Sequence, residues 1–512
     1  MSNSPAIDLS ALTSDLVSPL IIEDVRPLLA FVVPLIAVIG IGWAGEKRRN
    51  LRETFTFLAA VTQASVVLSM LPVILSGAII EFHIWQIFTH VPLLLRVDGP
   101  GLLFACVASL LWIATSAYAI GYMRGLHEHA QTRFYSYFAI SLSATMGVAF
   151  SANLLTIYFF YEMLSVSTFP LVTHMQDKDA RTGGRTYLGY LLFTSLCLLL
   201  PALSWCYVWL DEGNVTMDFL ADTSKVGMFS QTTQIILLCL FTFGFAKAGL
   251  MPLHSWLPGA MVAPTPVSAL LHAVAVVKVG VFCVYRVYTD IFGFDVLNSL
   301  DGEDWLIGIA CATILISSLI ALSQDNLKRR LAFSTVGQLG YIVLGATLAT
   351  EQGAGGAVLH IAMHACGKIT LFFCAGAIFV ATGKKYVSQL RGLARKMPIT
   401  MGAFMIGSLS VIGLPPLGGF NSKWYLALGA LDRGVTWVVF VLLISSLLNV
   451  FYLLPVAVTS FFRNPEEEDM LESKIQEAPS ACVVPLAITA IACFVLFFLA
   501  DPLLKLAGIS NN

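Results

Sequence analysis

The sequence predicts an all-α, polytopic membrane protein with about fourteen transmembrane helices. Of its 512 residues, 57% are hydrophobic and only 12% are charged, and the mean hydropathy is +0.81. A soluble domain carries about 25% charged residues, so this composition excludes an ordinary globular enzyme. The apolar residues occur in blocks of about 18 to 25, long enough to cross about 30 Å of hydrocarbon. The formal net charge of -2 gives no reason to expect a nucleic acid partner.

Fourteen apolar segments are the predicted spans. They cover residues 27–45, 55–78, 99–122, 133–150, 153–173, 184–209, 231–251, 264–289, 304–322, 331–350, 355–382, 398–416, 435–462 and 480–505. The short apolar residues of 418–431 are expected to extend the twelfth helix beyond a break. The stretch 80–98 is apolar but interrupted by polar residues, and it predicts an interfacial segment or a hairpin.

The distribution of Lys and Arg supports this number of spans. If loop 46–53 is cytoplasmic, the cytoplasmic connections hold nineteen of the 29 Lys and Arg residues and the opposite side holds five. A wrong number of spans would scramble this alternation, and the same rule places both termini outside. The first 26 residues lack the pattern of a cleaved secretory peptide. The acidic loop 463–479 is interpreted as a solvated turn rather than a binding tail.

The ten cysteines are interpreted as small core residues. They are scattered, almost all inside apolar runs, and no C-x-x-C pair occurs. Iron–sulfur and zinc sites need clustered thiolates, so no such cofactor is expected.

Titratable residues inside the spans are the strongest functional signal. Five basic residues lie within spans, and Glu162 is the single acid at a mid-span position. Each ionisable group at a helix centre costs about 2.5–3.5 kcal/mol on the insertion scale, so they would cost of order 10 kcal/mol together if nothing compensated them. Arg286 is close to an acidic outer loop and is expected to snorkel. For Glu162, Lys247 and Lys278, a functional role is the preferred interpretation.

Two of the buried lysines lie beside predicted helix breaks. Lys247 precedes Pro252 and Pro258, which must interrupt helical hydrogen bonding, and Lys423 follows the Pro/Gly-rich stretch 413–420. Broken helices are tolerated at membrane depth only where they face protein or water. Interrupted spans in both halves of a chain are the best sequence indication of a transport site.

A polar stripe is predicted on the eleventh span. His360, His364 and Lys368 are spaced at i, i+4 and i+8 and rotate by only about 80° in total. His272 and Lys278 are six residues apart, about 240° around a helix, and are expected to have different neighbours. A metal or haem site at the histidine pair lacks matching ligands. A proton relay fits best, because histidine and desolvated lysine both exchange protons near neutral pH.

At these residues the chain resembles the antiporter-like subunits shared by respiratory complex I, membrane-bound hydrogenases and Mrp-type cation/proton antiporters. The resemblance covers roughly residues 95–460. It rests on the motifs FYEMLSVSTFPLV, AKAGLMPLHSWLPGAMVAPTPVSALLHA, LKRRLAFSTVGQLGYI, HIAMHACGK and GLPPLGGFNSKW. The stretch VVKVGVFCVYRVYTDIF looks most like the D-type Mrp subunit. Where some relatives carry a glutamate, this chain has Lys423.

The resemblance implies two inverted five-helix repeats, each with one broken helix. The corresponding organisation is an N-terminal part at 1–132, a first repeat at 133–290, a second repeat at 304–462, and an acidic loop with the last helix at 463–512. The family also implies other membrane subunits as partners, within a bacterial inner membrane. It implies no cofactor and no metal.

The hypothesis is that Glu162 forms a partly buried pair with Lys247, and that weakening this pair releases the lysine's proton. The proton would then pass along a wetted relay kept open by Pro264 and Pro266. In order, the relay comprises Lys247, His272, Lys278, His360, His364, Lys368 and Lys423. The expected function is proton movement within a monovalent cation/proton antiporter that exchanges Na⁺ or K⁺.

Three alternatives remain at this point. The chain could be a proton-pumping arm of a redox complex, or it could energise inorganic-carbon uptake beside a soluble zinc partner. It could also be a structural membrane anchor whose buried charges only specify helix packing. No redox or hydrolytic motif of its own indicates an enzyme.

Overall fold

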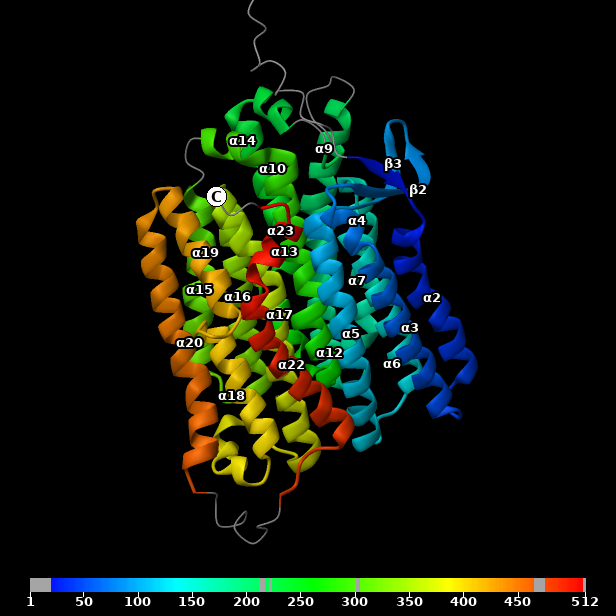
Figure 1. Ribbon diagram of the computed structural model, residues 1–512, viewed down its shortest axis with the longest axis vertical. Coiled ribbons are helices and arrows are strands. Elements are labelled where there is room, and N and C mark those ends of the chain that lie inside the picture. The colour runs from blue at the N-terminus through cyan, green and yellow to red at the C-terminus, as the bar shows by residue number, and fades with distance from the viewer. Residues whose placement is uncertain (1–19, 211–216, 221–222, 301–303, 465–474, 510–512) are drawn as a thin grey trace, which may run out of the picture.

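The structure is a computed structural model that describes residues 20–210, 217–220, 223–300, 304–464 and 475–509. Most of the N-terminal stretch assessed for a secretory signal and the centre of the acidic 463–479 loop lie outside these residues. The described chain forms a bundle of long helices with a small sheet at one end (Figure 1).

The helices follow the predicted apolar segments. In the first half they are α2 (Arg26–Ala44), α3 (Arg49–Ser69), α4 (Leu71–Leu75), α5 (Gly99–Gly125), α6 (Gln131–Ala149), α7 (Leu154–Val172), α8 (Lys178–Thr194), α9 (Leu200–Leu210), α10 (Gln231–Gly244), α11 (Trp256–Gly259), α12 (Thr265–Ala269), α13 (Val276–Arg286) and α14 (Gly293–Ser299). In the second half they are α15 (Asp304–Ser323), α16 (Leu327–Thr347), α17 (Glu351–Thr382), α18 (Pro398–Ile412), α19 (Gly419–Asp432), α20 (Thr436–Phe462), α22 (Ser480–Phe498) and α23 (Ala500–Leu506).

The predicted membrane fold is confirmed. Within the described ranges, ten helices are long and apolar enough to cross a membrane, and α10 and α18 are shorter apolar helices. The two remaining predicted spans are helical as well, because α6 and α16 occupy them. The basic connection between α17 and α18 lies at the end of the bundle opposite α23 and α14 (Figure 1). This agrees with the alternation of basic loops in the sequence.

The stretch 80–98 is a β-hairpin, one of the two predicted possibilities. Strand β2 (Ile79–Phe88) pairs antiparallel with β3 (Val91–Val97), and β1 (Ile21–Glu23) pairs parallel with β2. Arg96 links this sheet to the bundle, because its backbone N–H donates to the carbonyl of Phe150 at the end of α6 at 2.6 Å. Its guanidinium donates to Glu81 in β2 at 2.5 Å and to Asp218 at 2.6 Å. The pairing of the strands satisfies backbone groups that would otherwise lack hydrogen-bond partners at the end of the bundle.

Both predicted helix breaks are present. The helix before Lys247, α10, ends at Gly244, and Lys247 itself lies in the short 3-10 turn η3 (Ala246–Ala248) that follows. In the second half, α18 ends at Ile412, and α19 begins at Gly419. Gly413 adopts φ +90°, a left-handed conformation that favours glycine. By contrast, α17 runs for 32 residues without interruption and packs against α5, α12, α16, α18, α19 and α22 in the middle of the bundle (Figure 1).

The snorkelling predicted for Arg286 is wrong. The side chain is buried, and its guanidinium forms ion pairs with Asp98 at 2.5 Å and with Asp290 at 2.9 Å. Two carboxylates from the chain therefore compensate the charge, so the side chain has no need to reach water. The sequence separation of 188 residues between Arg286 and Asp98 hid this partner from local analysis.

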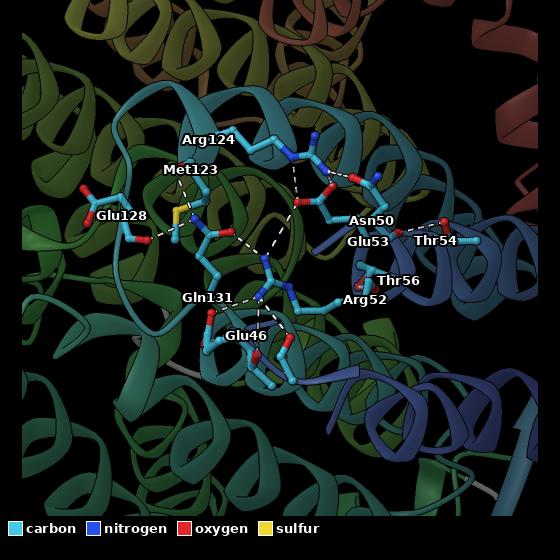
Figure 2. Close-up of polar contacts among 12 residues, drawn as sticks. Glu46, Asn50, Arg52, Glu53, Thr54, Thr56, Met123, Arg124, Glu128 and Gln131 are labelled. Atoms are coloured by element: carbon cyan, nitrogen blue, oxygen red, sulfur yellow. Dashed lines mark hydrogen bonds and ion pairs between the residues drawn. The ribbon is translucent and has the colours of Figure 1, made fainter. Parts of the chain in front are cut away.

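A polar cluster joins the N-terminal helices at the basic end of the bundle (Figure 2). Arg52 is fully buried and donates to Gln131 at 2.5 Å and to Glu46 at 3.0 Å. Arg124 donates to Glu53 on α3. The cluster ties α3 to the end of α5 and the start of α6, because Arg52 on α3 donates to Gln131 and Arg124 on α5 donates to Glu53.

Glu46 in this cluster predicts a modest loss of stability in acid. Burial raises the pKa of its carboxyl, but hydrogen bonds from Thr132 and the charge of Arg52 outweigh burial and place it below its usual 4.5. A carboxyl with a depressed pKa contributes stability above its unfolded pKa and loses it as pH falls through the folded value. We expect the midpoint of thermal unfolding in detergent to fall between pH 6 and about pH 3.5. This decrease should be smaller in Glu46→Gln than in the unaltered chain. Equal shifts in both proteins would contradict this assignment.

Candidate functional site

Lys247 is fully buried at the first helix break. Its ammonium donates to the Tyr161 carbonyl at 2.9 Å and to the Ser165 hydroxyl at 2.6 Å, and it lies 3.0 Å from the centroid of the Tyr161 ring. The Tyr161 hydroxyl accepts a hydrogen bond from the Lys247 backbone N–H at 3.2 Å. Carbonyl and ring dipoles thus compensate a charge that would be costly in hydrocarbon.

The predicted direct pair between Glu162 and Lys247 is absent, although the structure describes both residues. Lys247 instead binds the backbone and side chains of the same helix, α7. Glu162 is half-buried, and its Oε1 is buried with no hydrogen-bond partner among the described residues. Phe159 and Val166, which flank it on the same helix, are 49% and 61% exposed. Glu162 therefore lies near the exposed face of α7 and forms no direct ion pair with the lysine, but its charge is close enough to act on the ammonium.

Helix α13 closes directly against the break. A Cβ placed on Gly280 would lie 2.1 Å from the Ala248 nitrogen and 2.2 Å from the Lys247 carbonyl carbon. Only a residue without a side chain permits this approach. Gly280 thus brings α13, which carries Lys278, against the backbone of Lys247.

His272 and Lys278 both face α17, at different turns. The His272 ring lies 5.1 Å from that of Phe372, and the Lys278 ammonium lies 2.7 Å from His364 Nδ1. The prediction of different neighbours is correct at the level of residues, but both neighbours belong to one helix. A π-helical turn, η5 (Leu270–Val274), and the kink at Ala275 change the rotation between the two residues. Neither nitrogen of His272 has a hydrogen-bond partner in the described part of the chain.

A continuous set of contacts leads from Lys278 to the second break. His364 contacts Lys278, and the rings of His364 and His360 stack 5.5 Å apart at 8°. His360 Nδ1 lies 2.8 Å from the Ser422 hydroxyl, and its Nε2 lies 3.1 Å from Gln338 Oε1. Ser422 immediately precedes Lys423. The predicted stripe on this helix therefore runs from Lys278 to Ser422, the residue next to Lys423.

Lys368 leads in another direction. Its ammonium donates to Ser334 at 2.6 Å, and Ser334 lies 2.7 Å from the Tyr452 hydroxyl, which donates to Asn449. The Tyr452 carbonyl accepts from Arg330 at 3.1 Å, at the basic end of α16. Lys368 therefore connects the stripe toward the basic end of the bundle rather than toward Lys423.

Lys423 is buried at the second break in much the same manner as Lys247. Its ammonium donates at 2.7 Å to the carbonyl of Ile412, the last residue of α18, and at 3.0 Å to Ser446. The aromatic ring of Tyr341 lies 5.0 Å away. The helix break leaves that carbonyl without a partner in α18, and the lysine satisfies it.

A cavity of about 430 Å³ opens at the basic end of the bundle. Pro264 and Thr265 line it at the start of α12, and Ala375 lines it on α17. His272 lies seven residues beyond Thr265, and Lys368 lies seven residues from Ala375, about 10 Å along each helix. The cavity therefore approaches both residues from the side of the basic loops.

Sequence reasoning missed the hydroxyl and amide groups of the site. They are Tyr161, Ser165, Ser334, Gln338, Ser422, Ser446, Asn449 and Tyr452. One signal was present, because Tyr161, Ser165 and Ser422 each lie within three residues of Glu162 or Lys423. The others come from helices remote in sequence.

Comparison with known proteins places the eight titratable residues predicted from the sequence in one matched region. The family described as "NADH:quinone oxidoreductase/Mrp antiporter, TM" matches residues 151–449, which include all eight selected residues. The chain is 31% identical over 494 residues to the NADH-quinone oxidoreductase subunit N of Desulforudis audaxviator, covering 92% of this chain and 95% of that protein. It is 29% identical over 482 residues to a probable K(+)/H(+) antiporter subunit of Rhizobium meliloti, covering 91% of this chain and 46% of that protein.

Solved structures share the fold. The Mrp complex from Dietzia sp. DQ12-45-1b contains a chain with a TM-score of 0.82 at 22% identity, with 95% of this chain and 96% of that chain covered. A chain of the membrane-bound sulfane sulfur reductase, an archaeal respiratory membrane complex, matches with a TM-score of 0.81 at 22% identity and the same coverage.

Proposed function

Because this chain belongs to the membrane-subunit family shared by NADH:quinone oxidoreductases and Mrp antiporters, we propose that it moves protons through its buried lysine and histidine side chains. As an integral, multi-pass, antiporter-like subunit, it would work with other membrane subunits. The eight proposed residues are Glu162, Lys247, His272, Lys278, His360, His364, Lys368 and Lys423. We further propose a bacterial inner membrane location with both termini outside.

The observation that carries this proposal is the chain of contacts from Lys278 through His364 and His360 to Ser422, beside Lys423. Histidine and desolvated lysine can each gain or lose a proton near neutral pH. A structural anchor would need only compensated charges. The contacts from Lys278 to Ser422 instead place groups that can exchange protons one after another in space. Protons would reach it from the cavity at the basic end, through His272 or Lys368.

The two halves of the chain would hold the ends of this path. We propose that residues 133–290 and 304–462 are inverted repeats, each contributing one broken helix and one buried lysine. The similar settings of Lys247 and Lys423, each donating to a carbonyl and a serine hydroxyl, support this division. The remaining parts, 1–132 and 463–512, would flank the repeats.

The finer proposal is a D-type subunit of a monovalent cation/proton antiporter that exchanges Na⁺ or K⁺. The fold of an Mrp complex and a relative named as part of a K(+)/H(+) antiporter support it. The second candidate is a proton-pumping subunit of a redox complex. The extent of the match to subunit N of a NADH-quinone oxidoreductase favours this candidate.

Purification of the intact complex in mild detergent would separate these candidates. Reconstituted into vesicles with an internal pH dye, an antiporter should alkalinise or acidify the lumen on a Na⁺ or K⁺ pulse without any electron donor. A redox-driven pump should need an electron donor and should copurify with cofactor-bearing subunits. Absence of proton movement under both conditions would overturn the proposed function.

Replacing His360 with alanine should cut proton flux at least about tenfold, because it removes the bridge between His364 and Ser422. His83→Ala, at an exposed position on β2, is the matched control and should retain full flux. The measurement is dye quenching in the same vesicles, with assembly checked by gel filtration. Equal flux in the two variants would exclude His360 from the path.

A further inference from the structure

A second group of titratable residues lies apart from the relay, at the basic end of the bundle. Glu128 and His129 belong to the loop between α5 and α6, and His174 follows the end of α7. One ligand atom from each of the three side chains lies within 4.8 Å of the others. His129 Nδ1 and Glu128 Oε2 are 3.8 Å apart.

His174 is the unusual member of this group. It is 0% exposed, and neither of its ring nitrogens has a hydrogen-bond partner among the described residues. A buried imidazole without partners is costly, because it has lost hydration and gained nothing in exchange. The ring stacks on that of His129 at 4.9 Å, so its nitrogens lie beside the other two groups.

We propose that Glu128, His129 and His174 form a binding site for a zinc-type divalent cation. Two imidazoles and a carboxylate are a donor set that Zn²⁺ uses, with a fourth position left for water. Zinc–ligand bonds of about 2.1 Å set ligand atoms about 3.4 Å apart on a tetrahedron. The present spacing therefore needs only a small closing movement of the exposed His129 side chain.

The position of the site gives the ion a consequence. Glu128 also lines the 430 Å³ cavity through which we propose that protons enter. A cation at this point would fasten the α5–α6 loop to the end of α7, the helix that holds Lys247 through Tyr161 and Ser165. Bound zinc should therefore slow proton flux. This second part rests on the proposed function, whereas the binding site does not.

Zinc binding can be measured on the full chain in its purified complex, without any transport assay. We expect one Zn²⁺ per chain by calorimetry, and an intense tetrahedral absorption band with Co²⁺. His174→Ala, His129→Ala and Glu128→Gln should each weaken Zn²⁺ affinity at least about tenfold, since even outer-shell partners contribute 10–100-fold. His127→Ala, an exposed neighbour in the same loop, should bind as the unaltered chain does.

The His129→Ala and Glu128→Gln variants test whether misfolding explains a loss of binding. Both side chains are at least partly exposed, so their replacement should disturb the fold less than that of His174. Unchanged affinity in His129→Ala and Glu128→Gln, or the same loss in His127→Ala, would overturn the site. In vesicles, micromolar Zn²⁺ should slow proton flux in the unaltered complex but not in His129→Ala. Equal inhibition of both would overturn the proposed effect on flux, while flux without zinc tests the proposed function separately.

Discussion

Replacing Lys247 with methionine is expected to abolish proton-coupled transport while leaving the complex assembled. The ammonium is the exchangeable group at the first break, and methionine has a similar length but cannot carry a proton. The packing should survive, because the Ser165 hydroxyl already donates to the Tyr161 carbonyl at 3.1 Å and would keep it satisfied. Loss of function would thus arise from lost chemistry rather than from an unpaired buried group.

The measurement is proton flux in vesicles, normalised to assembled complex. Lys47→Met, at an exposed position in the loop after α2, is the matched control and should retain flux. Ser165→Ala should give an intermediate loss, because it removes one of the two acceptors that hold the ammonium. Flux equal to that of the unaltered complex in Lys247→Met would exclude Lys247 from the proposed proton path.

Gly280→Ala should be among the most damaging single-methyl additions in the chain. The new Cβ would lie within about 2.2 Å of backbone atoms of Lys247 and Ala248, which cannot rotate away as a side chain could. Overpacking usually costs 1–3 kcal/mol, and contact with backbone places this change at or above the upper end. The helix break and α13 must separate, and we expect both lower thermal stability and lost flux.

Gly402→Ala on α18 provides the control, because a Cβ there meets nothing within 4 Å. Thermal unfolding of both variants in mild detergent would compare the two positions directly. An unfolding midpoint for Gly280→Ala as high as that of Gly402→Ala would contradict this prediction, because it would show that the helix break accommodates the added methyl group.

The sequence predicted the helices well because span length and the alternation of basic loops are local properties. It also predicted both breaks, since proline and glycine disrupt helices wherever they occur. It failed where the partner was distant. Arg286 pairs with Asp98 across the bundle, and Lys247 donates to Tyr161 and Ser165 rather than directly to Glu162.

The proposed site was only partly predictable for the same reason. The spacing of His360 and His364 placed them on one face, and the structure stacks their rings. The rotation between His272 and Lys278 depended on a π-helical turn that no sequence pattern indicates. Nothing in the local sequence distinguishes Ser334 and Gln338 as polar partners. Their contacts with Lys368 and His360 arise only because α17 packs beside their helix.

The unbroken course of α17 has a genetic consequence. The single helix α17 places His364 against Lys278 and His360 against Ser422. A shift or rotation of this helix would therefore change both contacts together. A substitution on α13 that reduces proton flux should therefore be suppressed by second substitutions on α19. These residues would be far away in sequence and would not contact the first substituted residue. Suppressor selection would then reveal a mechanical linkage between the two halves of the chain.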